Sequence, residues 1–273
     1  MVSFWDAHVH LFPEPLFRSI WRWFGDYGWS TPYADWDLER YIACLEKMGM
    51  ERGFLLTYAH KPDMSLELNR WVRDTCSRYS VLIPFACIHP EDSNLEQVMA
   101  TALDDWQFAG FKLQLAVQQF YADDPKLDPI YRAATERQKP VIIHAGTAPY
   151  PPGSLYLGLG YLENVLAKWP ALKVVIPHLG LHELDRALLL VENYPNVYLD
   201  TSWALGKPEL GLPYARLVSF VEQFPQRFLY GSDFPIIEQS AECGLNDLLQ
   251  LGLTRGTLNS VLTDNARQLV GFA

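Results

Sequence analysis

The sequence predicts an α/β protein in which eight parallel strands, each followed by a helix, close into a single (β/α)8 TIM barrel. Short apolar runs alternate with longer amphipathic segments from one end of the chain to the other. The apolar runs lack polar alternation, which is typical of parallel strands that are covered on both faces. A length of 273 residues suits one such barrel. Because no linker divides the chain, we expect residues 1–273 to form one domain.

The expected strands are short runs of apolar residues bounded by turn-forming residues. The first begins in the apolar start Met1–Trp5 and continues to His10. Pro84 marks the start of the third strand rather than its middle, because proline cannot donate to a sheet. The second to eighth strands are expected at residues 53–58, 84–88, 110–114, 140–144, 172–176, 197–201 and 228–233.

Amphipathic segments between these runs predict the helices. Asp37 is a suitable N-cap for the first of them, and Gly49 a suitable end. Ser93 and Glu96 have the spacing of a capping box, and Pro129 suits a first helical turn. Further helices are expected from Ser65, from Ser93 to Trp106, from Asp128, and at residues 161–169, 183–194, 214–224, 241–251 and 257–270.

An aromatic-rich insertion, Leu11–Trp36, follows the first strand. It is interrupted by prolines and glycines and shows no clear helix or strand. A long segment of this kind is usually a functional loop or a lid. The alternative is a satellite hydrophobic cluster or a contact between subunits, so a homodimer is compatible with it.

Composition excludes several classes of partner. The formal net charge is −10, whereas nucleic acids and anionic membranes attract basic surfaces. No apolar run reaches the ~18 residues of a membrane span, and the N-terminus does not have the pattern of a signal peptide. The four cysteines lack CxxC spacing, which indicates free thiols in a reducing compartment. We therefore expect a soluble cytoplasmic globular protein.

Histidines are concentrated where the expected strands end, and active sites of (β/α)8 barrels lie at that end. His8 and His10 alternate on the first strand, so they project to one face ~7 Å apart along the backbone. Imidazole is a preferred ligand of transition metals. The other polar residues at strand ends are Lys112, His144, His178 and Asp233. Their convergence predicts a divalent metal site.

With these residues the sequence resembles the metal-dependent amidohydrolase superfamily, in particular its amidohydrolase-related branch, which also contains decarboxylases. The resemblance covers essentially the whole chain and depends on segments 6–10, 144–146, 178–180, 230–235 and 265–269. It implies that His8, His10, His144 and Asp233 bind a divalent metal, most often Zn, with Mn, Fe or Ni as alternatives. It also implies that His178 either binds a second metal or acts on the substrate, and that Asp233 carries a proton.

Lys112 leaves the number of metal ions open. In two-metal relatives a lysine on the fourth strand is carboxylated and bridges the ions, so Lys112 and His178 are candidates for a second site. The alternative is a buried amine beneath one ion, with Asp6 as its partner or as a group that orients a histidine. We favour one ion.

Three functions fit this pattern. A metal-activated water would hydrolyse a small amide, lactone or ester, which is the reading that we favour. The rival is a lyase, a decarboxylase or hydratase of an unsaturated or aromatic carboxylic acid, with Lys61, Arg18 or Arg22 holding the carboxylate. A non-catalytic barrel would have no need of the metal-type residues. Candidate residues of the substrate pocket are Phe12, Trp21, His60, Tyr150 and Trp203.

Overall fold

The structure, a computed structural model, describes residues 2–147 and 155–272. Parallel strands run through it in the expected order. The third expected strand is split into two at Phe85, and its first part begins at Leu82, so the prediction that Pro84 starts the strand is wrong: Pro84 ends that part. The strands are β1 (Phe4–Val9), β2 (Met50–Leu55), β3 (Leu82–Pro84), β4 (Ala86–Cys87), β5 (Phe111–Gln114), β6 (Val141–His144), β7 (Val174–Ile176), β8 (Val197–Asp200) and β9 (Phe228–Leu229).

Backbone hydrogen bonds join these strands into a ring. Pairing runs in chain order within β1–β2–β3 and within β4 to β9. The amide of Phe85 donates to Leu55 O at 3.4 Å, which connects β2 to the second group of strands. The amide of Ala7 donates to Tyr230 O at 2.8 Å, and the amide of His10 donates to Phe234 O at 2.8 Å. First and last strands are therefore neighbours, and the predicted barrel is confirmed.

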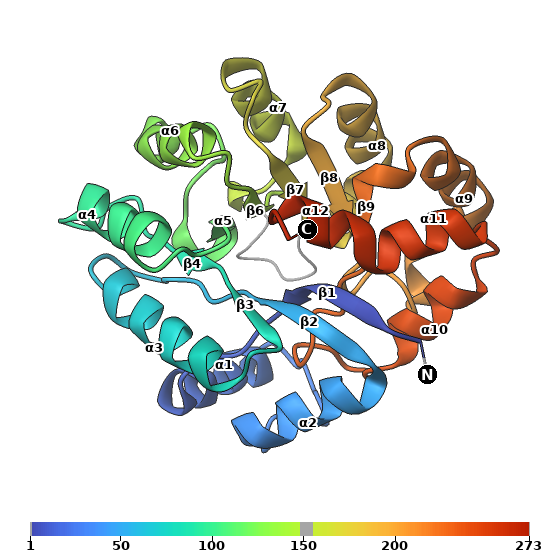
Figure 1. Cartoon of the computed structure of the whole chain (residues 1–273), viewed down its shortest axis with the longest axis horizontal. Coiled ribbons are helices and arrows are strands. Elements are labelled where there is room, and N and C mark those ends of the chain that lie inside the picture. The colour runs from blue at the N-terminus through green and yellow to red at the C-terminus, as the bar shows by residue number, and fades with distance from the viewer. Residues whose placement is uncertain (1, 148–154, 273) are drawn as a thin grey trace.

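Helices surround the strands, as Figure 1 shows. Asp37 caps the first helix of the ring by accepting from the amide of Arg40, and Gly49 ends that helix in the left-handed conformation, as predicted. The helices that follow strands are α2 (Leu38–Met48), α3 (Ser65–Arg78), α4 (Leu95–Ala100), the short α5 (Leu115–Gln118), α6 (Asp128–Glu136), α7 (Leu159–Lys168), α8 (Leu184–Asn193), α9 (Tyr214–Gln223), α10 (Cys243–Gln250), α11 (Arg255–Asn259) and α12 (Asn265–Leu269).

The predicted capping box at the start of α4 is wrong. The Ser93 amide and hydroxyl both donate to the carboxylate of Asp63, at 2.7 and 2.8 Å. Asn94 is the N-cap residue, and its side chain makes no capping bond. A tertiary contact between two loops has therefore replaced the local one.

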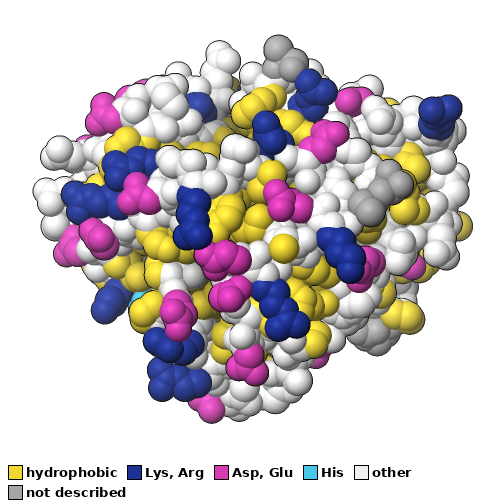
Figure 2. Space-filling view, turned by 60° about the horizontal axis from the view of Figure 1, so that its bottom comes forward, with side chains coloured by type: hydrophobic (Ala, Val, Ile, Leu, Met, Phe, Trp, Pro, Cys, Tyr) yellow, Lys and Arg dark blue, Asp and Glu magenta, His cyan; other side chains and the backbone are white. Residues whose placement is uncertain are grey.

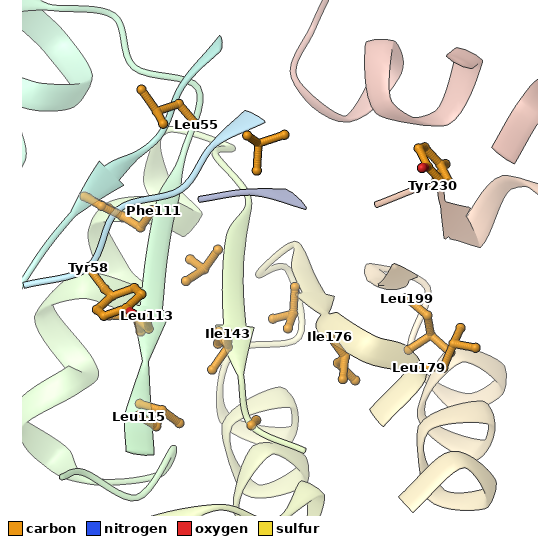
Figure 3. Close-up of a cluster of buried hydrophobic side chains, with 14 of the residues drawn as sticks. Leu55, Tyr58, Phe111, Leu113, Leu115, Ile143, Ile176, Leu179, Leu199 and Tyr230 are labelled. Carbon is orange, nitrogen blue, oxygen red and sulfur yellow. The ribbon is translucent and has the colours of Figure 1, made fainter. Parts of the chain in front are cut away.

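Two apolar layers hold the barrel together. Inside it, side chains such as Phe54, Phe85 and Ile142 pack in one cluster with Ala266 and Leu269 of α12. Figure 1 shows α12 and the C-terminus over the middle of the strand ring, where they cover one end of this inner cluster. Outside it, the alternate strand residues pack against the helices; Figure 3 labels Phe111, Leu113, Ile143, Ile176 and Leu199 among them.

The aromatic insertion contains a helix that we did not predict, α1 (Glu14–Asp26). Pro15 lies in its first turn, where the missing amide costs no hydrogen bond, so proline starts this helix instead of breaking it. Phe17 is the residue of α1 that is fully buried, and its ring stacks on Trp21 with the centroids 4.7 Å apart. The segment is thus a helical cap and not an irregular loop.

The surface carries both signs of charge. On the face shown in Figure 2, basic and acidic side chains are interspersed and form no patch of one sign. Among the described residues, no helix combines the length and the apolar character that a membrane span requires.

Candidate active site

The two histidines of β1 meet at the end of the barrel where the strands finish. His8 Nε2 lies 3.1 Å from His10 Nε2, and both side chains are buried. Each ring is held from behind through its other nitrogen: His8 Nδ1 contacts Asp200 Oδ2 at 2.8 Å, and His10 Nδ1 contacts Leu56 O at 2.7 Å. The two Nε2 atoms therefore face a common centre.

Asp233 completes a compact group with these histidines. Its Oδ1 lies 3.3 Å from His10 Nε2 and 3.5 Å from His8 Nε2. Its backbone has a φ of 67°, and its amide donates to His8 O at 2.9 Å. Burial opposes ionisation of Asp233, but the contact with His10 and the neighbouring imidazoles outweigh it and hold its pKa below the usual value. The site thus contains a carboxylate.

His178 approaches the same centre from a strained loop. Residues His178, Leu179, Gly180 and Leu181 all have positive φ, a conformation that costs energy in residues other than glycine. His178 Nδ1 contacts Ser202 O at 2.9 Å, so Nε2 is the nitrogen left for the centre. Ligand atoms of His8, His178 and Asp233 all lie within 4.8 Å of one another.

His144 ends β6 and lies at the margin of the group. Its Nδ1 is 3.2 Å from His178 Nε2 and 3.3 Å from Gln114 Nε2. Its Nε2 is buried and has no hydrogen-bond partner among the described residues. The structure thus brings all four expected ligands, together with His178, to one place, and it places His178 closer to the shared centre than the sequence suggested.

The donor set fits a divalent ion. Two ligands ~2.1 Å from one ion lie ~3.0–3.4 Å apart when the angle between them is ~90–110°, and the contacts of His8, His10 and Asp233 are of this size. Burial, followed by nearby positive charge, lowers the pKa of His8 and of His144, which keeps both imidazoles neutral, as metal ligands must be. Nitrogen and carboxylate oxygen suit Zn, Mn and Fe.

Lys112 lies against the nitrogen of His8 that faces the shared centre. The residue is fully buried, and its Nζ is 3.4 Å from His8 Nε2. Burial lowers the pKa of Lys112 to about 8, although the carboxylates of Asp200 and Asp233 oppose that shift.

Asp6 does not lie beside that lysine. Its Oδ1 accepts from the amides of His8 and Ser232, at 2.9 and 3.0 Å. Relative to β2, the first strand has an irregular register between Asp6 and Val9, and simple alternation does not account for it. Of the two roles expected for Asp6, the pairing with Lys112 is therefore corrected, whereas its contact with the His8 amide agrees with a group that orients a histidine.

A cavity of about 450 Å³ opens from the histidine and aspartate group. His10, His144, His178 and Asp233 form its polar end. Its other walls are mainly apolar and come largely from α1 and the residues after it: Leu16, Ile20, Trp23, Phe24, Tyr27 and Trp29. Of the expected pocket residues, His60 and Trp203 line this cavity.

Other expected pocket residues lie elsewhere. Phe12 stacks against the His10 ring at 6.1 Å between centroids, and Trp21 packs on Phe17, so both support the cavity wall from behind. Tyr150 lies outside the described residues.

The candidate carboxylate-binding cations do not line the cavity. Arg18 pairs with Glu14 on the exposed side of α1, Arg22 donates to Ser19, and Lys61 is exposed. The Arg18 and Arg22 side chains point to solvent because the apolar face of α1 is turned towards the barrel. The three residues are therefore corrected to surface positions.

Sequence reasoning missed Asp200, Ser202 and Gln114. Asp200 and Gln114 are the last residues of β8 and β5, and Gln114 lines the cavity. A polar residue at the end of an apolar strand was the signal that identified Asp233, and applied to every strand it would also have found these two.

Comparison with known proteins gives one family and many similar barrels. A family model described as Amidohydrolase matches residues 5–272. No curated protein matches the chain. Among solved structures, an uncharacterised TIM-barrel protein from Bordetella bronchiseptica is 21% identical with a TM-score of 0.77, over 99% of both chains.

Two other similar structures are decarboxylases. The 2,6-dihydroxybenzoate decarboxylase from Rhizobium is 16% identical, with a TM-score of 0.70 over 99% of both chains. The 5-carboxyvanillate decarboxylase from Novosphingobium aromaticivorans, complexed with manganese and 4-hydroxy-3-methoxy-5-nitrobenzoic acid, is 17% identical. Its TM-score is 0.72, over 98% of this chain and 96% of that one. At these identities the likeness establishes the fold.

Proposed function

This chain belongs to the amidohydrolase family, and on that premise we propose that it catalyses the decarboxylation of a small aromatic carboxylic acid. The sequence favoured hydrolysis, with a lyase as the alternative. The alternative is the better supported of the two, because similar structures are named as decarboxylases of aromatic acids.

The observation that carries the proposal is the two-ended cavity. One end presents His10, His178 and Asp233, and the other presents aromatic rings. A flat acid fits such a cavity with its ring among the aromatic side chains and its carboxylate towards the polar end. The indole N–H groups of Trp29 and Trp203 have no partner among the described residues and are available to an oxygen of the ligand.

One divalent ion would be held by His8, His10 and Asp233. His144 and His178 are the two candidates for a further imidazole ligand. When bound, the ion supplies a fixed positive charge that neutralises an anionic oxygen of the substrate. Zn is the ion that the sequence favoured, and the manganese named in the similar decarboxylase structure supports Mn equally well. Among the described residues, His8, His178 and Asp233 form the one cluster of histidine, cysteine and carboxylate ligands close enough to share an ion, which supports a single ion.

Asp233 is the proposed proton carrier. When the bond between the ring and the carboxylate breaks, its electron pair stays on the ring carbon and CO2 leaves. That carbon then takes a proton from the carboxylic acid of Asp233, which regains one from solvent. The contact with His10 and the neighbouring imidazoles hold the pKa of Asp233 low, so it rests as the carboxylate, and it would carry to the ring carbon a proton that it first takes up from solvent.

The test is to measure product from two substrate panels after loading the protein with Mn²⁺ or Zn²⁺. One panel holds hydroxylated and methoxylated benzoic acids, and CO2 release is followed. The other holds esters, lactones and amides, and hydrolysis is followed. We expect CO2 from at least one acid. Hydrolysis of the second panel without any CO2 release would overturn the proposal in favour of a hydrolase.

The role of Asp233 has its own prediction. Asp233→Asn is expected to lower kcat by about 10²–10⁴-fold, because the amide cannot carry the proton. Far-UV circular dichroism should show an unchanged fold. Asp92→Asn is the matched control, since Asp92 is also a buried carboxylate and its donors among the described residues are the amides of Asp63 and His89. Full activity of Asp233→Asn would remove Asp233 from the mechanism.

A further inference from the structure

Asp200 lies behind the histidines and does not line the cavity. It is the last residue of β8 and is fully buried. Its Oδ2 contacts His8 Nδ1 at 2.8 Å, on the side of the imidazole that faces away from the centre. The carboxylate therefore supports a group of the site without belonging to it.

The other oxygen of the same carboxylate holds the opposite wall of the site. Asp200 Oδ1 accepts from the amide of His178 at 3.1 Å and from the amide of Ser202 at 3.0 Å, and it also accepts from the Ser202 hydroxyl. Ser202 O in turn contacts His178 Nδ1 at 2.9 Å. One carboxylate thus joins β1 to the strained loop after β7.

That loop needs such a contact. His178 has a φ of 57°, in the left-handed region that residues with a side chain rarely adopt. A backbone in this conformation persists where its surroundings hold it, and the bond from the His178 amide to Asp200 is such a restraint. Asp200 therefore acts on both the direction and the position of imidazoles that come from distant parts of the chain.

We propose that Asp200 is a positioning residue that keeps the hydrogen of His8 on Nδ1, and so leaves the lone pair of Nε2 for the metal ion. Asp200 Oδ1 already accepts from three donors, and with Oδ2 also acting as an acceptor the nitrogen that contacts it, His8 Nδ1, is the donor. A histidine that donates from one nitrogen to a carboxylate binds a metal more effectively through the other. This inference rests on the metal site of the proposed function.

Asp200→Asn separates the two contacts of the carboxylate, the one with His8 Nδ1 and the one with the loop that carries His178. Asparagine has almost the same shape but only one acceptor oxygen, and three donors converge on the Oδ1 side. The amide oxygen is expected to stay with His178 and Ser202, so the NH2 group faces His8 Nδ1. That nitrogen must then accept, which moves the hydrogen of His8 to Nε2 and blocks the metal-binding position.

The experiment measures Zn²⁺ affinity by competition with a chromophoric chelator, and Co²⁺ binding by its visible spectrum. We expect Asp200→Asn to bind Zn²⁺ about 10–100-fold more weakly than wild type and to give an altered Co²⁺ spectrum. Asp92→Asn, whose carboxylate also accepts backbone hydrogen bonds through both oxygens but does not touch the site, should bind as wild type does.

A double-mutant cycle with His8→Ala shows whether the effect passes through His8. In the His8→Ala background, Asp200→Asn should change Zn²⁺ affinity by less than about 2-fold. A general structural role of Asp200 would instead weaken Zn²⁺ binding by about 10–100-fold in this background as well. ¹⁵N NMR of the wild-type apoprotein needs no variant, and it should show the Nδ1–H tautomer for His8.

The outcomes separate the inference from the proposed function. Unchanged Zn²⁺ affinity in Asp200→Asn, or an Nε2–H tautomer of His8 in the wild type, overturns the role of Asp200 alone. A wild-type protein that binds neither Zn²⁺ nor Co²⁺ overturns the metal site itself. Reduced Zn²⁺ affinity in Asp200→Asn without decarboxylation by the wild type leaves the positioning role intact and refutes the reaction.

Discussion

Burial determines how the cysteine side chains of this barrel behave. It raises the pKa of the Cys76 and Cys87 thiols to about 12, and the Cys87 Sγ lies 3.3 Å from Asn69 Oδ1. The thiolate is the reactive form of cysteine, and near pH 8 a thiol with this pKa is ionised in only about one molecule in 10⁴. The two thiols are thus structural groups.

This argument predicts which thiols react. At pH 8 iodoacetamide should label the partly exposed Cys243 in the folded protein and leave Cys87 unmodified. Peptide mass mapping measures both, and a sample unfolded in guanidinium chloride provides the control in which every cysteine is labelled. Equal labelling of Cys243 and Cys87 in the folded protein would contradict the burial of Cys87.

Single residues also show where sequence reasoning reaches its limit. Alternation along a strand was enough to predict that His8 and His10 converge. It was not enough for Asp200, whose partner His8 lies 192 positions earlier in the chain. Nor could it show that Phe12 lies behind the cavity wall, because a one-residue irregularity near the strand end changes which face a side chain takes.

Among the elements, α1 has the clearest effect on the cavity. Trp29, just after this helix, stacks on Trp203 at 5.8 Å between ring centroids. The Lys207 ammonium lies 4.4 Å from the centroid of the Trp203 ring and also pairs with Glu238. These contacts anchor the end of the α1 segment to the loops after β8 and β9. Prolines and glycines hid the helix from sequence reasoning because they bound it without interrupting it.

Removing this anchor should weaken substrate binding. A stacked aromatic pair is worth about 0.5–1.5 kcal/mol, so Trp29→Ala is expected to raise KM for the aromatic acid by about 2–10-fold with a smaller change in kcat. Trp106→Ala is the control, since Trp106 packs on Phe108 away from the cavity. If both variants raise KM equally, α1 does not position the cavity wall.

The loops after β6 and β7 touch through two glycines. A Cβ added to Gly146 would lie 2.8 Å from Gly180 O, closer than real contacts allow. Gly146→Ala must therefore displace the strained loop that carries His178. We expect it to lower the free energy of unfolding by about 1–3 kcal/mol, measured by urea denaturation, and to weaken Zn²⁺ binding. Gly256→Ala, which meets open space within α11, should not lower the free energy of unfolding and should leave Zn²⁺ binding unchanged.

For the whole molecule, alternation of apolar runs and amphipathic segments was enough to predict the barrel, since each element repeats the same signal. The split of the third strand and the packing of α12 depend on how the ring of strands closes. The third strand divides into β3 and β4 on either side of Phe85, and the amide of Phe85 donates to Leu55 O of β2. The plug formed by α12 on the inner cluster likewise depends on distant contacts, and a local pattern does not contain them.

The central claim is that side chains from β1 and from the loops after β7 and β9 bind one divalent ion beside an aromatic cavity. Metal content of the purified protein after dialysis against Zn²⁺ or Mn²⁺ and desalting tests it most directly, with wild type compared against His8→Ala and His144→Ala. We predict about one equivalent per chain in the wild type and a large loss in His8→Ala. A wild type that retains no metal, or a His8→Ala variant that retains as much as the wild type, would contradict the account.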